Sequence, residues 1–167
     1  MCSPRPPHKH MPKLYFASDH AGFTLKDALI AYARHRGYEV EDMGASVLDQ
    51  DDDYPDFVTP CAKRVVEEGT HAIGIVIGAS GQGEAMCANR VPGIRAAVFY
   101  GEPAHEQTDA LGESLTMIAS VREHNDANML ALGARFVSLE TARGALQKFL
   151  DTPFSGAERH VRRLGKF

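Results

Sequence analysis

The chain has 167 residues, a formal net charge of −4, and hydrophobic and charged fractions of 44% and 24%, which suit one ordinary globular domain with a substantial core. The charge gives no reason to expect nucleic-acid binding, and no apolar run is long enough to cross a membrane or placed to act as a secretory signal. The three cysteines lack the spacing of a metal site, so the simplest expectation is a cytoplasmic protein without a bound metal.

The predicted elements follow a polar N-terminal segment. Residues 1–12 are rich in Pro, Lys, Arg and His and are expected to form a disordered tail, so that residues 13–167 make a single domain. Short apolar runs predict five strands, at residues 13–17, 38–42, 72–78, 94–99 and 129–133.

Helical patterns alternate with these strands. They run over residues 24–36, 54–68, 84–91 and 138–150, and again after Ser155. Thr24 with Asp27, and Ser155 with Glu158, have the spacing of a capping box at a helix start. The pattern is weaker between residues 101 and 121, where 103–111 is compatible with a helix, Gly112 interrupts it and 115–119 resumes it. Strands alternating with helices predict an α/β protein whose parallel sheet has helices on both faces.

The third strand runs into a glycine-rich loop that ends in a carboxylate. The loop carries Gly78, Gly81 and Gly83, and Glu84 opens the next helix. This geometry directs backbone N–H groups at an anionic or carbonyl oxygen, but a loop that only bound phosphate would gain nothing from Glu84. The spacing does not match a dinucleotide fingerprint, a nucleophile elbow or a Walker loop. A plain strand-to-helix turn remains the alternative.

Two further groups of polar residues lie at junctions between elements. Asp19 and His20 follow the first strand, at the edge where parallel sheets place ligands, although a turn with a capping Asp is the commoner origin of such a pair. His124 and Asn125 end a helical segment, a position where the helix dipole also favours His. Because His124 precedes its strand, it should lie at the opposite end of the sheet. It either reaches the site by a long detour of the segment before it or serves a site on another subunit.

Three arginines are candidates for phosphate binding. Arg159 and Arg163 are spaced i, i+4 on the last predicted helix and therefore share a face, and Arg135 lies just past the fifth strand. Guanidinium groups match phosphate geometry well. A solvated basic face is the alternative for the two arginines of the helix.

Taken together, these segments resemble the ribose-5-phosphate isomerase type B family, which also includes galactose-6-phosphate isomerase subunits. The resemblance covers the chain from Lys13 to about Arg163. Its carriers are Ser18-Asp19-His20-Ala21-Gly22, Asp53-Tyr54-Pro55, Gly78-Ala79-Ser80-Gly81-Gln82-Gly83, Ala88-Asn89-Arg90-Val91-Pro92-Gly93-Ile94-Arg95-Ala96, His124-Asn125-Asp126-Ala127-Asn128 and Glu158-Arg159-His160-Val161-Arg162-Arg163.

The resemblance implies a three-layer Rossmann-like fold with a five-stranded parallel sheet, no cofactor, and a homodimer or tetramer whose sites lie between subunits. It implies isomerisation of ribose 5-phosphate to ribulose 5-phosphate through an enediolate, as in the pentose phosphate pathway. The implied roles are as follows: Glu84 as base and His124 in ring opening; Asp19, His20, Ser80, Gly81, Gln82, Gly83 and Asn125 in substrate binding; and Arg135, Arg159 and Arg163 in phosphate binding.

Two features depart from the common pattern of this family. Many members carry a cysteine as the base just before the glycine loop, where this chain has Gly78, whereas a branch resembling the mycobacterial enzymes carries a glutamate that Glu84 matches. The segment at 101–121 is longer than in typical members. The alternatives are therefore an isomerase of a tetrose or hexose phosphate, and a sugar-phosphate-binding module without catalysis.

Overall fold

The computed structural model describes residues 11–103, 105, 107–109 and 112–167. Five strands form one sheet, and every strand pair in it is parallel. The strands are β1 (Lys13–Ser18), β2 (Val40–Asp42), β3 (Ala72–Gly78), β4 (Ala96–Phe99) and β5 (Met129–Gly133), in the spatial order β2-β1-β3-β5-β4. The first ten residues of the expected N-terminal tail lie outside the described part of the chain.

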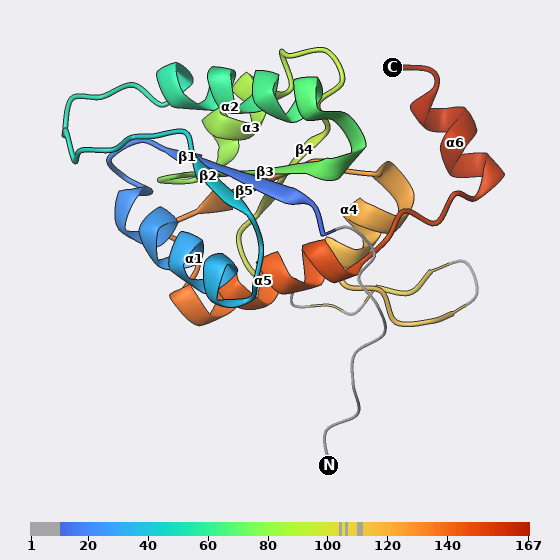
Figure 1. Cartoon of the computed structure of the whole chain (residues 1–167). Coiled ribbons are helices and arrows are strands. Elements are labelled where there is room, and N and C mark those ends of the chain that lie inside the picture. The colour runs from blue at the N-terminus through green and yellow to red at the C-terminus, as the bar shows by residue number, and fades with distance from the viewer. Residues whose placement is uncertain (1–10, 104, 106, 110–111) are drawn as a thin grey trace.

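Helices cover both faces of this sheet. The helices are α1 (Phe23–His35), α2 (Pro55–Glu68), α3 (Gln82–Ala88), α4 (Met117–Asn125), α5 (Leu139–Asp151) and α6 (Glu158–Leu164), with a short 3-10 helix at Gly69–His71. Figure 1 shows α2 and α3 above the sheet and α1, α4 and α5 below it. The predicted three-layer α/β fold is confirmed.

Each face of the sheet has its own hydrophobic core, because alternate side chains of a strand point to opposite faces. On the side of α1 and α5, Phe16, Ile75 and Leu130 are fully buried. On the side of α2 and α3, Tyr15 and Val76 are fully buried. The strands β3 and β5 are buried along their whole length, as expected for the centre of a covered parallel sheet.

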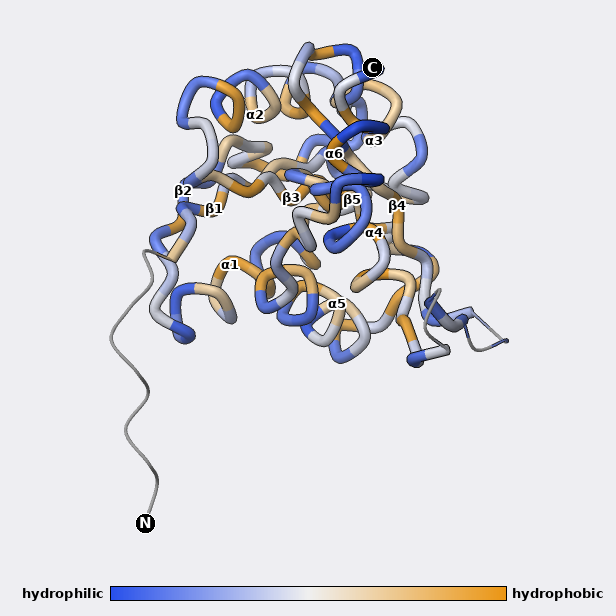
Figure 2. The backbone as a smooth tube through the Cα atoms, turned by 90° about the vertical axis from the view of Figure 1, so that its right-hand side faces the viewer, coloured by the Kyte–Doolittle hydropathy of each residue, from blue (hydrophilic) through white to orange (hydrophobic). Residues whose placement is uncertain are grey.

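Helix α6 stands apart from the two layers. Figure 1 shows it to the right of the sheet, and Figure 2 shows that it is strongly hydrophilic. Only His160 of this helix is buried. Among the residues that the structure describes, no helix has both the length and the apolar character needed to cross a membrane.

Both predicted capping boxes are wrong, whereas the predicted start of α5 is confirmed. Ser138 caps α5 by accepting a hydrogen bond from the Thr141 backbone N–H at 3.1 Å. Helix α1 instead begins at Phe23, with Gly22 as its N-cap and no side-chain cap. The reason is a tertiary contact: a Cβ atom at position 22 would overlap the Ile77 carbonyl of β3. Helix α6 likewise begins at Glu158 without a side-chain cap.

The weakly patterned segment before α4 also differs from its prediction. None of its described residues is helical before α4 begins at Met117, and Thr108 and Ser114 instead form an isolated antiparallel bridge. The Asp109 carboxylate accepts the Glu113 backbone N–H at 3.0 Å, which stabilises a turn in place of a helix. Strand β4 begins at Ala96, two residues later than predicted.

A buried lysine ties α1 to the loop beside the ligand edge of the sheet. The Lys26 ammonium is fully buried and lies 2.7 Å from both carboxylate oxygens of Asp42 and 2.8 Å from the Ala45 carbonyl oxygen. The second carboxylate near it, that of Asp27, is 3.6 Å away and 54% exposed. Lys26 therefore depends mainly on Asp42 for its countercharge.

We expect Asp42→Ala to lower the free energy of unfolding by about 2–3 kcal/mol, because it leaves a buried ammonium without its main partner. Asp27→Ala is the matched control, and its expected cost is below about 1 kcal/mol because that pair is exposed and longer. Urea unfolding of both variants measures the difference. Equal losses in the two variants would contradict the assignment.

Candidate active site

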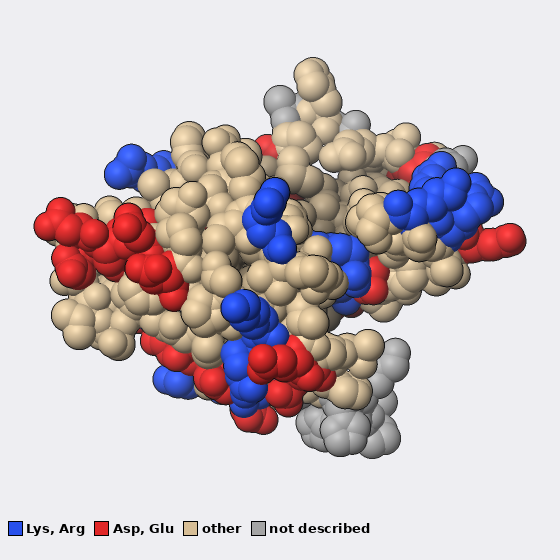
Figure 3. All heavy atoms as spheres, turned by 90° about the horizontal axis from the view of Figure 1, so that it is seen from above, with Lys and Arg blue, Asp and Glu red and all other residues tan. Residues whose placement is uncertain are grey.

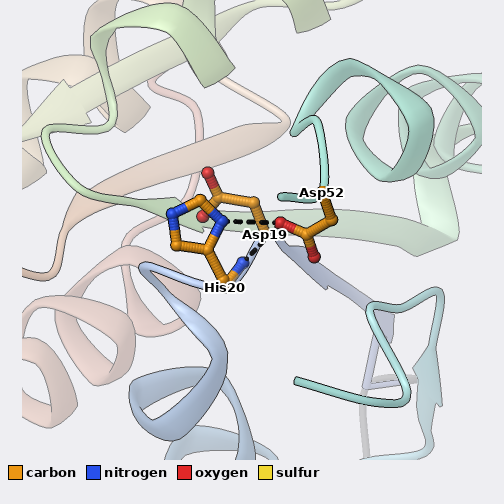
Figure 4. A group of neighbouring side chains, drawn as sticks. All are labelled: Asp19, His20 and Asp52. Atoms are coloured by element: carbon orange, nitrogen blue, oxygen red, sulfur yellow. Dashed lines mark hydrogen bonds and ion pairs between the residues drawn. The ribbon is translucent and has the colours of Figure 1, made fainter. Parts of the chain in front are cut away.

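The loops that follow β1, β2 and β3 meet at the carboxyl edge of the sheet. Asp19 and His20 follow β1, Asp52 lies in the loop between β2 and α2, and the glycine loop follows β3. Figure 4 shows Asp19, His20 and Asp52 side by side, with the Asp52 carboxylate next to the His20 ring. The structure therefore brings Asp19 and His20 to the same edge as the glycine loop, as the sequence predicted.

Asp19 is held rigidly at this edge. Its side chain is buried, and one carboxylate oxygen accepts the backbone N–H groups of Ala21 and Gly22 at 3.0 and 3.3 Å. These bonds form an Asx-type turn, so Asp19 also has the turn-stabilising role that was the alternative interpretation of this residue. The turn also fixes the position of the Asp19 carboxylate relative to Glu84. The negative charge of Asp19 raises the pKa of Glu84.

Glu84 occupies the space beside Gly78. A Cβ atom at position 78 would overlap the Glu84 carboxylate, so only glycine is compatible with this side chain in place. Glu84 is 4% exposed. Burial raises its pKa above the ordinary value, and backbone hydrogen bonds at Glu84 and Gly81 oppose the shift. A buried carboxylate with a raised pKa is suited to act as a general base near neutral pH.

The glycine loop turns sharply to place its amides beside this carboxylate. Gly81 has a φ of 75°, in the left-handed region, and is the N-cap of α3. The Ser80 hydroxyl accepts the Gln82 backbone N–H at 3.3 Å. A Cβ atom at Gly83 would lie 2.8 Å from the Tyr54 hydroxyl, so the Tyr54 ring packs directly against the loop.

The second group of candidates lies at the amino edge of the sheet. His124 and Asn125 end α4, and the His124 ring stacks on that of His160 in α6, with a centroid distance of 4.3 Å and an interplanar angle of 9°. Nε of Arg159 donates a hydrogen bond to Nε2 of His160 at 3.1 Å. Burial lowers the pKa of His160, and the neighbouring His124, Arg159 and Arg163 lower it further.

The candidate residues thus fall into two groups within one chain. The carboxyl edge holds Asp19, His20, Ser80, Gly81, Gln82, Gly83, Glu84 and Arg135, and the amino edge holds His124, Asn125, Arg159 and Arg163. Figure 3 shows the same separation as charge, with acidic side chains over the β2–α2 loop at one end and basic side chains over α6 at the other. The prediction that His124 lies at the opposite end of the sheet is confirmed, and the segment before α4 does not carry it round to Glu84.

Sequence reasoning missed two side chains of the carboxyl edge. Asp52 contacts the ring of His20, and Tyr54 contacts the glycine loop. The signal for Asp52 was the run of aspartates at 49 and 51–53, in which nothing marks one residue above the others. His160 was also missed, because its contact with His124 joins residues 36 positions apart.

Asp19, His20 and Asp52 also form the one group in the described part of the chain whose side-chain atoms could meet at a metal ion. One ligand atom from each lies within 4.8 Å of the others. However, Nδ1 of His20 and Oδ1 of Asp52 are only 2.7 Å apart, so these two atoms satisfy each other directly. A hydrogen-bonded pair explains this geometry without a metal ion.

Known proteins resemble this chain over nearly its full length. A family model described as Ribose/Galactose Isomerase matches residues 14–167. Proteins named ribose-5-phosphate isomerase B from Mycolicibacterium paratuberculosis and Mycobacterium tuberculosis are each 38% identical over 152 residues, covering 91% of this chain and 87% and 85% of theirs.

Solved structures agree with this. Ribose-5-phosphate isomerase B from Mycoplasma genitalium, with bound ribulose-5-phosphate, has a TM-score of 0.81 and 34% identity and covers 92% of both chains. The Clostridium thermocellum enzyme has a TM-score of 0.78 and 40% identity, covering 92% of this chain and 93% of that one. The fold, the order of the motifs and these matches agree, and the chain therefore belongs to the ribose/galactose isomerase family.

Proposed function

We propose that this protein interconverts ribose 5-phosphate and ribulose 5-phosphate through an enediolate, with Glu84 as the base. The observation that supports this best is the buried Glu84 carboxylate, which fills the space beside Gly78 at the ligand edge of the sheet. The mycobacterial relatives named ribose-5-phosphate isomerase B support the choice of substrate. A binding module would have no use for a buried base with a raised pKa.

The proposed reaction moves one proton between neighbouring carbons. The Glu84 carboxylate takes the proton from C2 of the open-chain aldose, and the electrons of that C–H bond form the C1–C2 double bond. The former carbonyl oxygen O1 then carries the negative charge of the enediolate. Glu84 returns the proton to C1 while the hydroxyl proton of O2 passes to O1, which gives the ketose.

The remaining carboxyl-edge residues would bind the reacting end of the sugar. Backbone N–H groups of the loop from Ser80 to Gly83 would stabilise the charge on O1, since donors fixed in advance cost no reorganisation during the reaction. The Ser80 hydroxyl would hold a substrate oxygen, and Asp19 would orient the sugar hydroxyls. Arg135 and His20 would meet the phosphate from this edge.

A second subunit would supply the rest of the site. The residues still missing from the site lie at the far edge of the same chain. They are His124, proposed to open the furanose ring, Asn125, proposed to bind the enediolate, and Arg159 and Arg163, proposed to bind the phosphate. In a two-fold symmetric homodimer, the amino edge of each subunit can lie against the carboxyl edge of the other. One symmetric interface would then complete two sites. The opposite charges of the two edges favour that contact.

We further propose that residues 13–167 form a single isomerase domain and that the protein works in the cytoplasm. Cys61 and Cys87 are both free in the described structure, and Cys61 is buried. Free cysteines of this kind fit a reducing compartment. Neither cysteine lies at the position of the proposed base.

The test of this function is isomerisation by the purified protein. Ribose 5-phosphate should be converted to ribulose 5-phosphate, and in D₂O one deuterium should enter the sugar at the exchanging carbon. The panel also includes a tetrose phosphate and a hexose phosphate. Turnover of only one of these would replace the proposed substrate, and an absence of both turnover and exchange throughout the panel would contradict the isomerase function.

A further inference from the structure

One aspartate of the acidic loop differs from its neighbours. The side chain of Asp52 is only 9% exposed, whereas Asp49, Asp51 and Asp53 are exposed. Oδ1 of Asp52 accepts two hydrogen bonds from one residue: the backbone N–H of His20 at 2.9 Å and the ring nitrogen Nδ1 of His20 at 2.7 Å. Its other oxygen, Oδ2, is buried without a hydrogen-bond partner in the described structure.

These contacts fix both the orientation and the proton pattern of the His20 ring. A carboxylate can only accept, so Nδ1 must carry a proton, and Nε2 is the nitrogen left for a ligand. In the neutral ring with this tautomer, Nε2 has no proton and can only accept a hydrogen bond. In the charged ring, Nε2 also carries a proton and can donate to an anion.

The surroundings of His20 favour the charged ring. The hydrogen bond to Asp52 raises the pKa of His20, burial opposes this, and the negative charges of Asp19 and Asp52 raise it further. Glu84, from α3, is a further carboxylate at this edge. Arg135, after β5, is an exposed cation at the same edge.

We propose that Asp52 is a positioning residue, which holds the His20 imidazole so that Nε2 presents a proton to the phosphate of the sugar substrate. The ligand in this statement rests on the proposed function, whereas the pairing of Asp52 with His20 does not. An orienting carboxylate behind a histidine is a common way to fix which nitrogen faces the ligand. Here it would let an edge rich in carboxylates accept the anionic end of the sugar.

The proposal has a definite pH dependence. The donor on Nε2 is present below the pKa of His20 and is lost as the pH rises through it. Because Asp52 raises that pKa, removal of its charge moves the loss to lower pH. Substrate binding by a variant without this carboxylate should therefore weaken at a lower pH than in the wild-type protein.

The test compares Asp52→Asn with the matched control Asp51→Asn, which removes one charge from the same loop without touching His20. We expect Asp52→Asn to raise KM roughly five- to tenfold at a pH between the ordinary histidine pKa and the raised pKa of His20, with kcat changed less than about twofold, since a charge-assisted hydrogen bond is replaced by a weaker one. The KM of Asp51→Asn should stay close to that of the wild-type protein. Equal effects of the two variants would overturn the proposal.

Two further measurements separate positioning from a general structural effect. In a His20→Gln background, Asp52→Asn should add almost nothing to KM, because the two residues act as one unit. In the intact wild-type protein, NMR titration of His20 should find Nδ1 protonated throughout and a pKa above the ordinary histidine value. An ordinary pKa or a proton on Nε2 alone in the neutral ring would overturn the pairing. This measurement needs no substrate, so it decides the pairing even if the isomerase function fails.

Discussion

Replacement of Glu84 by glutamine is expected to lower the rate of isomerisation by about two to four orders of magnitude, the usual contribution of a general base. Glutamine has the same shape and fills the same space beside Gly78, so the fold and substrate binding should be kept. The rate is measured with ribose 5-phosphate in both directions, and proton exchange at the reacting carbon is followed in D₂O. Both should fall together, because both need the same base.

The control for this variant is Glu140→Gln, which removes a carboxylate from an exposed position in the first turn of α5. Its rate should equal that of the wild-type protein. The pH profile gives a second check, since Glu84 acts only when ionised. Burial raises its pKa above 4.5, so kcat/KM of the wild-type protein should fall as the pH falls through that raised value. A Glu84→Gln variant with near-normal turnover would contradict the assignment.

The contact with Gly78 allows the same idea to be tested without removing the carboxylate. A methyl group at position 78 would overlap Glu84, so Gly78→Ala must displace the carboxylate or the strand end that carries position 78. We expect loss of isomerisation even though Glu84 is still present. In the double variant Gly78→Ala/Glu84→Ala the overlap is absent. Its free energy of unfolding should therefore be higher than that of Gly78→Ala, while its activity stays low.

The architecture was accessible from the sequence because local patterns and tertiary structure agree. The run that becomes β3 is apolar and β-branched on both faces, and Ser138 lies where a helix N-cap is expected. The start of α1 was not accessible in this way. Thr24 and Asp27 fit a capping box, but packing of Gly22 against Ile77 decides where that helix begins.

The candidate site was only partly accessible for a related reason. The order of strands and helices places His20 and Glu84 at one edge and His124 at the other, since parallel strands all point the same way. The contact between His20 and Asp52 instead joins residues 32 positions apart through an irregular loop, and no periodic pattern specifies it. The mutual exclusion of Gly78 and Glu84 likewise depends on how sharply the chain turns between them.

The separation of the two edges leads to the second large effect, which is restoration of activity by mixing two inactive variants. Glu84→Gln damages the carboxyl edge and His124→Ala damages the amino edge. In a mixed dimer with shared sites, one site receives both substitutions and the other receives neither. Random pairing makes about half of the dimers mixed, so about a quarter of the wild-type activity should return.

Co-expression of the two variants with different affinity tags, followed by purification on both tags, isolates the mixed dimers and should raise their activity to about half of the wild-type value. The matched control combines Glu84→Gln with Gly78→Ala, which both damage the carboxyl edge, so no mixed dimer contains an intact site. If both mixtures stay inactive although mixed dimers are recovered, Glu84 and His124 do not share a site across the subunits. Recovery in the first mixture alone would mean that each site joins the Glu84 edge of one subunit to the His124 edge of its partner. That is the result we expect, because these two residues lie at opposite edges of the sheet in a single chain.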